Sequence, residues 1–341
     1  MARSYRIMAI VPFSAAASGG KLVPMNEVPN TMRAISQDVL GGPEVLHEVE
    51  LPVPTPGPSQ ILVRVRAAGV NPTDWKHRAR KGLFLPEPPF VLGWDVSGEV
   101  AAVGFGVTLF RPGDEVFGML PYPFGVGSFA EYAVGPARAF ARKPANLNHT
   151  EAGAIPLAAL TAWQALVDTA NLQAGQRILI HAAAGGVGHF AVQIAKHLGA
   201  YVIGTASAGN HEFLRSIGAD ETIDYRTTDF AEAVRDVDVV LDTVSGDTTV
   251  RSLDTLRPGG ILVSILGLSD DALTQAHSRG LRAVAMLVEA DHAGMDALRR
   301  LAESGALRPT IAGAFPLADA AKAHELGDTN RTVGKLVITM P

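Results

Sequence analysis

Residues 178–190 read Ile-Leu-Ile-His-Ala-Ala-Ala-Gly-Gly-Val-Gly-His-Phe, and this stretch decides the fold. An apolar run with β-branched residues, Ile178 to Ile180, leads into a glycine-rich corner. Apolar residues then recur with the spacing of a helix as far as Leu198. A strand, a glycine corner and an amphipathic helix in this order are typical of a unit that holds a pyrophosphate at the helix N-terminus.

The glycines of this corner have separate tasks. The backbone must lack a side chain where it passes a phosphate, and the following helix must pack closely on its strand. Ala183 stands where the commonest Gly-x-Gly-x-x-Gly fingerprint has its first glycine, so the cluster alone is weak evidence. Its place between a strand and a helix, with a second strand at 201–204, favours it over the alternative of an ordinary glycine-rich turn. We predict that the cofactor phosphates bind at Ala184, Gly185, Gly186, Val187 and Gly188.

The residues after the second strand indicate which dinucleotide binds. NAD sites usually place Asp or Glu there to bind the ribose 2′-hydroxyl. Residues 205–210 read Thr-Ala-Ser-Ala-Gly-Asn and hold no carboxylate that would repel a 2′-phosphate. Ser207 and Asn210 can donate hydrogen bonds to such a phosphate, although both could also be ordinary loop residues. The sequence therefore favours NADPH over NADH.

The composition excludes several classes of protein. A chain of 341 residues with 47% hydrophobic and 18% charged residues can form two domains with large cores. Its net charge of −5 gives no basic surface for nucleic acid, and no apolar run of about 20 residues predicts a membrane span. The chain contains no cysteine, which excludes disulfides, zinc–thiolate sites and a cysteine nucleophile. We expect a cytoplasmic protein that acts on small molecules.

The first 31 residues differ from the rest of the chain. Arginines precede a short apolar run, 7–13, and alanines follow it, which superficially matches a secretory signal. Pro12 interrupts that run. We interpret residues 1–31 as an extension, disordered or added by cloning or an upstream start, with the fold beginning near Met32; export is the alternative.

The remaining chain divides into two kinds of pattern. Residues 32–154 carry alternating strands and frequent Pro and Gly turns, which predict a β-rich domain. Residues 155–304 alternate helix and buried strand, which predicts the doubly wound parallel sheet of a Rossmann domain in an α/β protein. Residues 305–341 hold one helix and a closing strand, which we assign to the first domain. The predicted elements include a helix at 157–170 and strands at 178–180, 201–204, 222–223, 237–241 and 261–265.

Several further motifs occur in one order along the chain. They read GVNPTDWK at 69–76, VLGWDVSGEVAAVG at 91–104, RPGDEVFG at 111–118, GSFAEYA at 127–133 and IPLAALTAWQAL at 155–166. With the glycine corner and the closing GKLVI they resemble the medium-chain dehydrogenase/reductase superfamily, and within it the zinc-independent quinone oxidoreductase branch. The resemblance runs from about Met32 to Ile338 and implies that the β-rich domain is a GroES-like catalytic domain.

The alcohol dehydrogenases of that superfamily hold a catalytic zinc with two cysteines and a histidine. At the matching positions this chain has Asn71, Trp94 and Leu157, which make no credible zinc site. We therefore expect no metal. Alcohol oxidation needs a Lewis acid or a base for the hydroxyl proton, so the resemblance implies a different reaction.

The reaction we expect is hydride transfer from NADPH to an electron-poor acceptor, a quinone or an α,β-unsaturated carbonyl compound. The transfer places negative charge on the acceptor oxygen, and nearby hydrogen-bond donors would stabilise it. Asn71, Lys76 and Tyr122 are the candidate catalytic donors. The structural alternatives are that Asn71, which precedes a proline, sets a turn and that Lys76 is a solvated helix residue.

Neighbouring residues in these motifs have structural interpretations that we favour. Asp74 is suited to cap the helix that follows it. Trp75 and Trp94 fit packing better than substrate binding. His181, beside the glycine corner, fits a hydrogen-bonded structural histidine better than a catalytic one.

The resemblance also implies further contacts with the cofactor. In the quinone oxidoreductase branch a tyrosine reaches the 2′-phosphate and Tyr225 matches it, whereas Asn210 stands near the place of the usual basic residue. Thr161 matches a position on the nicotinamide side. The remaining contacts implied are those of Asp242, Leu266 and Gly267 along the adenosine and nicotinamide, and of Lys335 over the ribose.

The sequence thus predicts an NADPH-dependent quinone or enone oxidoreductase. The alternatives are an enoyl reductase of polyketide or fatty-acid biosynthesis and a non-catalytic NADPH-binding structural or regulatory protein. The resemblance implies a homodimer that joins through an edge strand near 261–265. Acceptor selectivity is expected in the loops at 78–89, 121–127 and 268–287.

Overall fold

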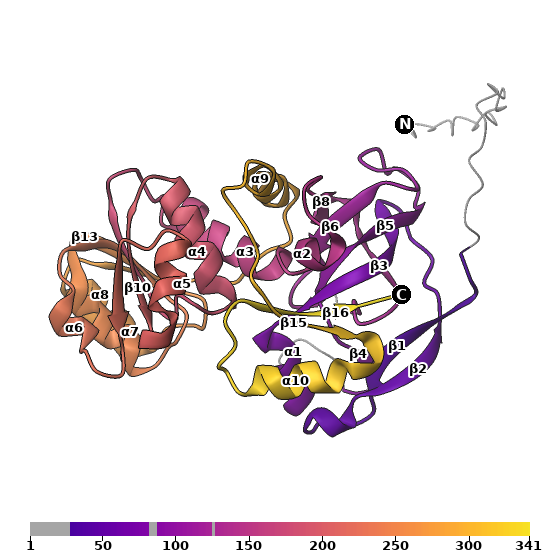
Figure 1. The fold of residues 1–341 in the computed structure, drawn as a ribbon, viewed down its shortest axis with the longest axis horizontal. Coiled ribbons are helices and arrows are strands. Elements are labelled where there is room, and N and C mark those ends of the chain that lie inside the picture. The colour runs from indigo at the N-terminus through magenta and orange to yellow at the C-terminus, as the bar shows by residue number, and fades with distance from the viewer. Residues whose placement is uncertain (1–27, 82–86, 125–126) are drawn as a thin grey trace, which may run out of the picture.

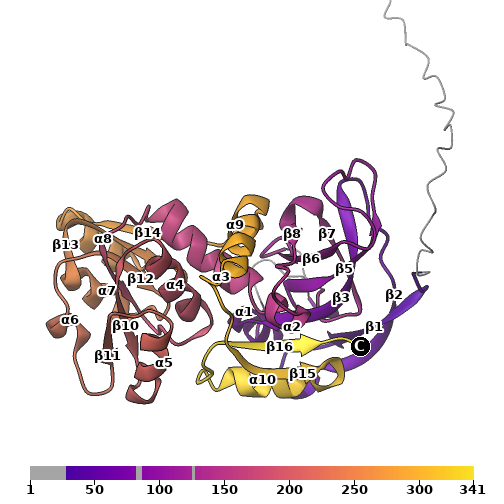
Figure 2. The same cartoon turned by 45° about the horizontal axis from the view of Figure 1, so that its top comes forward.

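The structure, a computed structural model, describes residues 28–81, 87–124 and 127–341. Two lobes lie side by side, one built on a six-stranded sheet and the other on a seven-stranded sheet (Figures 1 and 2). Helices α3 (Pro156–Trp163) and α9 (His292–Glu303) lie between the lobes. The predicted N-terminal extension lies outside the described residues as far as residue 27, and strand β1 begins at Thr31.

The six-stranded sheet confirms the predicted Rossmann fold. Its order is β11-β10-β9-β12-β13-β14, and each neighbouring pair is parallel. The chain starts at the centre, moves outward in one direction and then returns to the other side of β9, so the order reverses between β9 and β12. Ligands of doubly wound sheets bind at such a reversal, above the carboxyl ends of the strands. The strands are β9 (Arg177–Ile180), β10 (Tyr201–Ala206), β11 (Glu221–Asp224), β12 (Val237–Asp242), β13 (Leu256–Ser264) and β14 (Arg282–Ala285).

Helices cover both faces of this sheet, which explains why its central strand is a continuous apolar run. Ile178, Leu179 and Ile180 of β9 are fully buried. The covering helices are α4 (Gly186–His197), α5 (His211–Ser216), α6 (Phe230–Ala233), α7 (Asp247–Ser252) and α8 (Asp270–Ser278).

The prediction of the edge strand was wrong. Residues 261–265 fall on and just after β13, which has β12 on one side and β14 on the other. The edge is β14, a short and partly exposed strand. Because β14 lacks a long apolar run, it was included in the stretch 268–287, which we expected to be loop and which also contains α8.

The seven-stranded sheet is centred on β3 (Gln60–Val70), which pairs antiparallel with β5, β7 and β16. Because β16 belongs to the last segment of the chain, that segment pairs with the sheet of the N-terminal lobe. A three-stranded sheet, β2-β1-β4, borders it. The other strands of this lobe are β1 (Thr31–Gln37), β2 (His47–Pro52), β4 (Phe90–Val91), β5 (Asp95–Val103), β6 (Glu115–Met119), β7 (Tyr132–Pro136), β8 (Phe140–Arg142), β15 (Ile311–Pro316) and β16 (Lys335–Thr339).

Helix α1 (Pro72–Ala79) follows β3 directly, with its proline at the favoured first position. It packs against α10 (Ala320–Asp328), where the Arg78 guanidinium donates to His324 Nδ1 (3.2 Å) and to Asp328 Oδ2 (2.8 Å). These contacts fix the orientation of α1. A short helix, α2 (His149–Gly153), packs on β3.

The helix predicted at 157–170 is α3 followed by a π-helical turn, Gln164–Thr169. Short 3₁₀ turns occur at Pro43–Val45, Ala137–Ala139, Ala208–Asn210, Leu253–Thr255 and Leu317–Asp319. Among the described residues, no helix combines the length and the apolar character that a membrane crossing requires.

Candidate active site

A cleft of about 500 Å³ lies between the lobes, at the reversal of the Rossmann strand order. One wall consists of the glycine corner and the ends of β12 and β13, and the other of the β3–α1 corner, the start of β16 and part of α10. We call it the interlobe cleft. Its lining residues include Asn71, Trp75, Lys76, Leu157, Ala182, Gly185, Gly186, Val187, Gly188, Thr243, Leu266 and Lys335.

The glycine corner has the geometry of a phosphate site. Gly185 precedes α4 and Gly186 begins it, so the free N–H groups of the first turn lie at the cleft. A Cβ on Gly188 would lie 2.4 Å from the Ala182 oxygen and 2.7 Å from the Ala183 Cα, which are backbone atoms that cannot yield. This contact confirms the predicted close packing of helix on strand. A Cβ on Gly186 would instead point toward Lys335, 3.4 Å from its Cδ, so the absent side chain leaves the cleft open to a dinucleotide.

His189 fixes the backbone of this corner through a hydrogen bond to Gly185, a role that the sequence did not predict. The residue is fully buried, its Nδ1 donates to the Gly185 oxygen (2.9 Å), and its Nε2 accepts from Thr310 N (3.4 Å). Burial lowers the pKa of His189 to about 4, so the ring stays neutral near pH 7. The Gly-His-Phe sequence placed His189 on the first turn of the helix but could not reveal its partner from residue 310.

The predicted 2′-phosphate contacts lie at the ends of two adjacent strands. Ser207 follows β10 and Tyr225 follows β11, and Ala206 and Asp224 are partners in the sheet. Asn210 Nδ2 donates to Ser207 Oγ (3.3 Å), and the Tyr225 ring is 56% exposed. The Arg226 guanidinium lies 5.7 Å from that ring, which places a cation beside the site where the sequence analysis found none. The adjacency of Tyr225 and Arg226 in the chain was the signal that could have identified it.

Of three other residues predicted to contact the cofactor, two have hydrogen-bond partners within the protein and one is exposed in the cleft. The Asp242 carboxylate is buried and accepts from Val244 N, Ser245 N and Thr249 Oγ1, so it shapes the turn after β12. Thr161 Oγ1 donates to the Leu157 oxygen of its own helix (2.7 Å) and is not among the lining residues of the interlobe cleft. Leu266 is 45% exposed in the cleft, which gives a ligand an apolar surface to cover.

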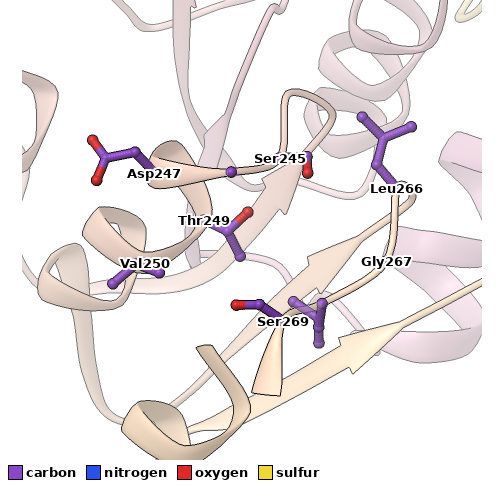
Figure 3. A pocket seen from close by; sticks show the side chains of 9 residues that line it. Ser245, Asp247, Thr249, Val250, Leu266, Gly267 and Ser269 are labelled. Atoms are coloured by element: carbon purple, nitrogen blue, oxygen red, sulfur yellow. The ribbon is translucent and has the colours of Figure 1, made fainter. Parts of the chain in front are cut away.

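A second recess of about 390 Å³ adjoins the interlobe cleft at Leu266. It lies between the loops after β12 and β13 and includes Gly267, whose φ of +90° suits glycine (Figure 3). Figure 3 shows the Asp247 carboxylate directed away from the other labelled side chains. Ser269 Oγ caps α8 by accepting from Ala272 N (3.1 Å), so this polar group is already engaged.

The opposite wall of the cleft is organised by a buried ion pair. Lys335 Nζ donates to the Val70 oxygen (2.9 Å) and to Asn71 Oδ1, and lies 3.7 Å from Asp95 Oδ2. Asp95 accepts from Asn71 Nδ2 (2.9 Å) and from Leu157 N (2.6 Å). Asn71, Asp95 and Lys335, which we call the wall triad, are all at least 97% buried, since none exceeds 3% exposure. The triad joins β3, β5, α3 and β16 at one point.

The triad refines two predictions. The Asn71 amide nitrogen donates to Asp95 Oδ2 (2.9 Å) and more weakly to the Gly69 oxygen (3.5 Å), so an acceptor would have to displace the longer of these two contacts. The Lys335 ammonium binds Asn71 and the end of β3, although the residue also lines the cleft. Burial lowers the pKa of Lys335 and raises the pKa of Asp95, while the attraction between the two groups opposes both effects.

Asp74 closes the same corner from α1. Its carboxylate accepts from Asn71 N (2.7 Å) and from Gly93 N (3.1 Å). Asp74 therefore takes part in capping, but the predicted position was wrong: α1 begins at Pro72, Asn71 is its N-cap, and Asp74 is the third residue of the helix and binds back to the cap. Burial raises the pKa of Asp74 to about 8.

The other two candidate donors differ in their access to the cleft. Lys76 lines it, and burial and the nearby Arg80 charge lower the pKa of its ammonium. Tyr122 lies outside the lining, accepts from Thr73 Oγ1 (3.3 Å) and packs edge-on against Trp94 at 5.3 Å between ring centroids. Trp94 is fully buried, as the packing interpretation required, whereas Trp75 lines the interlobe cleft and can contact a ligand.

His181 has the structural environment that we predicted for it. It is 2% exposed, and its ring nitrogens lie 3.3 Å from Thr205 Oγ1 and 2.8 Å from Ser252 Oγ. Burial lowers the pKa of His181 to about 4. Both ring nitrogens are therefore engaged, and the residue does not face the cleft as a free acid or base.

Known proteins resemble this chain in sequence and in fold. The family profile described as alcohol dehydrogenase GroES-like domain matches residues 57–145, and the one described as zinc-binding dehydrogenase matches residues 217–338. A 2-haloacrylate reductase from a Burkholderia species is 36% identical over 87% of this chain and 96% of its own length. The solved quinone oxidoreductase of Coxiella burnetii has a TM-score of 0.85 and 37% identity, covering 91% of this chain and all of that one. The Escherichia coli quinone oxidoreductase, solved in complex with NADPH, has a TM-score of 0.81 and 31% identity over 90% of this chain and 99% of that one.

The fold and the cleft define a class, the oxidoreductases that bind a dinucleotide between a Rossmann sheet and a GroES-like lobe. The similarity to relatives extends over nearly the whole of both chains. The chain belongs to the medium-chain dehydrogenase/reductase superfamily, among its quinone-oxidoreductase-like members.

Proposed function

We propose that the protein is an NADPH-dependent oxidoreductase that reduces quinones or α,β-unsaturated carbonyl compounds. The observation that carries this proposal is that one cleft combines a phosphate-binding glycine corner with a wall that presents Lys76 and Asn71. Relatives with the names of a quinone oxidoreductase and a 2-haloacrylate reductase support the acceptor class, and the relative solved with NADPH supports the coenzyme.

The residues of this chain would hold the dinucleotide along the carboxyl edge of the Rossmann sheet. The first turn of α4 would bind the pyrophosphate through backbone N–H groups. Ser207, Tyr225 and Arg226 would surround the 2′-phosphate, and Leu266 would cover the nicotinamide end. When bound, NADPH supplies the hydride.

The catalytic wall would then complete the reduction. Hydride addition forms a C–H bond at the β-carbon, and the electron pair of the C=C bond moves to the carbonyl oxygen to give an enolate. Lys76 lines the cleft and would stabilise this negative charge. Asn71 would add a second donor by exchanging its long contact with the Gly69 oxygen (3.5 Å) for the acceptor oxygen. A proton from Lys76 or from water then adds to the α-carbon of the enolate and gives the saturated carbonyl compound. Tyr122, the third predicted donor, lies outside the lining of the cleft and would need a water to pass its proton on. Most of the rate enhancement would come from holding hydride and acceptor together in the cleft.

We propose that this reaction proceeds without zinc, even though one matching profile is named for zinc-binding dehydrogenases. The positions that match the zinc ligands hold Asn71, Trp94 and Leu157, of which none is a zinc ligand of ordinary type. Their contacts are internal, because Asn71 bonds to Asp95 and Leu157 N bonds to the same carboxylate.

Three further proposals concern organisation. The domains are 32–154 with 305–341 as the GroES-like domain and 155–304 as the Rossmann domain, because β16 pairs with β3 while β9 to β14 form one sheet. A homodimer would join through β14, whose outer edge has no partner strand in the described chain. We also propose that the protein acts in the cytoplasm. Its net charge of −5 supports small molecules, and not nucleic acid, as its binding partners.

Steady-state assays test the proposed reaction. We expect the purified protein to oxidise NADPH with a panel of quinones, enones and enals, and to retain this activity in a metal chelator. NADPH oxidation that requires added zinc would contradict the zinc-independent mechanism, and failure with the whole panel would contradict the proposed function.

A further inference from the structure

The charged groups that line the interlobe cleft are unbalanced. Lys76 and Lys335 are the cations among its lining residues, and the lining of the described chain includes no aspartate or glutamate. The two buried carboxylates nearby, Asp74 and Asp95, both face inward to their own donors. The surface that an acceptor would meet is therefore positive.

The two lysines differ in what they bind. Lys335 is engaged with Val70, Asn71 and Asp95 and helps to hold the wall together. Lys76 lies on the cleft wall with part of its side chain buried and part open to solvent, and within the described residues no carboxylate lies within 4.0 Å of its Nζ. Lys76 is thus the cation of the cleft that has no partner in the described chain.

The local sequence explains why Lys76 stays unpaired. On a helix, ion pairs form between residues three or four positions apart. The residues at those distances from Lys76 are Pro72, Thr73, Ala79 and Arg80, and none is acidic. Arg80 adds repulsion, which is one cause of the lowered pKa of Lys76. On the neighbouring helix, Asp328 is already paired with Arg78.

The Rossmann wall of the cleft has a separate anion site for the phosphates of the dinucleotide. The glycine corner on α4 and the strand ends at Ser207 and Tyr225 belong to the Rossmann lobe, whereas Lys76 lies on α1 of the catalytic lobe. Lys76 therefore lines the cleft on the wall opposite the dinucleotide site, which leaves it available to an acceptor.

We propose that the preferred acceptors are α,β-unsaturated carbonyl compounds that carry a carboxylate, and that Lys76 binds this carboxylate. The inference rests on the proposed function and names its substrate class. The carboxylate supplies the charge partner that the chain does not provide, and a charge-assisted hydrogen bond orients the C=C bond toward the hydride. NADPH is oxidised and the C=C bond is reduced; one hydride and one proton are added, and the carboxylate takes no part in the bond changes.

The test compares β-acetylacrylate with its methyl ester, which share the enone and differ in charge. We measure kcat/KM for both compounds with the wild-type protein and with Lys76→Gln. The quantity of interest is the acid-to-ester ratio, because any general catalytic role of Lys76 affects both compounds and cancels. We expect this ratio to fall about tenfold or more in Lys76→Gln and to be largely restored in Lys76→Arg.

Lys322→Gln is the matched control, since Lys322 is an exposed lysine that pairs with Asp319 on the surface. It should leave the acid-to-ester ratio unchanged. An unchanged ratio in Lys76→Gln would overturn the inference while leaving the proposed function intact. Weaker NADPH binding in Lys76→Gln with the same ratio would also overturn it, because Lys76 would then serve the cofactor. If the wild-type protein reduced neither compound nor any member of the panel, the proposed function itself would fail.

Discussion

The two walls of the interlobe cleft are built in opposite ways. The turn of the glycine corner is formed by a backbone contact between close neighbours in the chain, Gly185 N to the Ala182 oxygen (2.9 Å), and contacts with Thr205, Thr310 and Gly334 then support it. The facing wall is held by side chains that are distant in sequence, because Lys335 and Asn71 are 264 positions apart. A local backbone motif can be recognised from sequence alone, whereas a wall made of distant side chains becomes visible only once the chain is folded.

The largest loss of stability is expected from a substitution in the wall triad. Lys335→Met would leave the Asp95 carboxylate buried without its cation, which costs about 3–5 kcal/mol in the free energy of unfolding. Denaturant unfolding measures this loss. The double variant Asp95→Asn with Lys335→Met removes both charges and should recover part of the loss. If the single variant were as stable as the wild type, the wall triad would not organise this wall.

A smaller loss of stability is expected from a substitution in the glycine corner. In Gly188→Ala the new Cβ would lie 2.4 Å from the Ala182 oxygen, so α4 must shift away from its strand at a cost of about 1–3 kcal/mol. NADPH affinity should fall with it, because the first turn of α4 moves. Gly209→Ala is the matched control for stability alone, since a Cβ there meets no atom within 4 Å but the residue lies between Ser207 and Asn210 of the proposed cofactor site. Equal stability of the two variants would show that the close packing at Gly188 is not required.

The effect that is smallest at neutral pH concerns the contact between α1 and α10, and it grows as the pH falls. Burial, together with the Arg78 charge, lowers the pKa of His324 to about 3. Below its ordinary pKa of about 6.5 the unfolded chain binds a proton at this position while the folded chain does not, so stability falls as pH falls. His324→Gln should remove about 1.4 kcal/mol per pH unit from that slope between about pH 6 and pH 4.

Denaturant unfolding at several pH values measures the slope for both proteins. Glutamine can still accept from Arg78 through its side-chain oxygen, so the variant retains the contact between α1 and α10. Parallel slopes for the wild type and His324→Gln would mean that His324 is protonated in the folded state.

Much of the fold was predictable because its signals are local. The buried strand at 178–180 and the glycine corner both appear as expected. β14 was missed because its pattern is short and only partly buried, so it lacks the apolar run that identified the other strands.

The site was predictable to a different extent. The neighbouring sequence was enough to predict the role of the glycines, but the roles of Asp95, His189 and Arg226 were missed. Asp95 and His189 depend on partners brought from remote parts of the chain, and no spacing rule gives them. The roles of Asn71, Lys76 and Tyr122 in catalysis remain predictions, and the structure adds that Asn71 and Lys76 line the cleft while Tyr122 does not.

The central claim is that the glycine corner and the ends of β10 and β11 form a site for NADPH. Titration of the protein with NADPH and with NADH, followed by quenching of protein fluorescence, tests it most directly. We expect NADPH to bind with a dissociation constant about tenfold or more below that of NADH, because Ser207, Tyr225 and Arg226 lie where the 2′-phosphate would sit. Tighter binding of NADH, or no binding of either, would contradict this account.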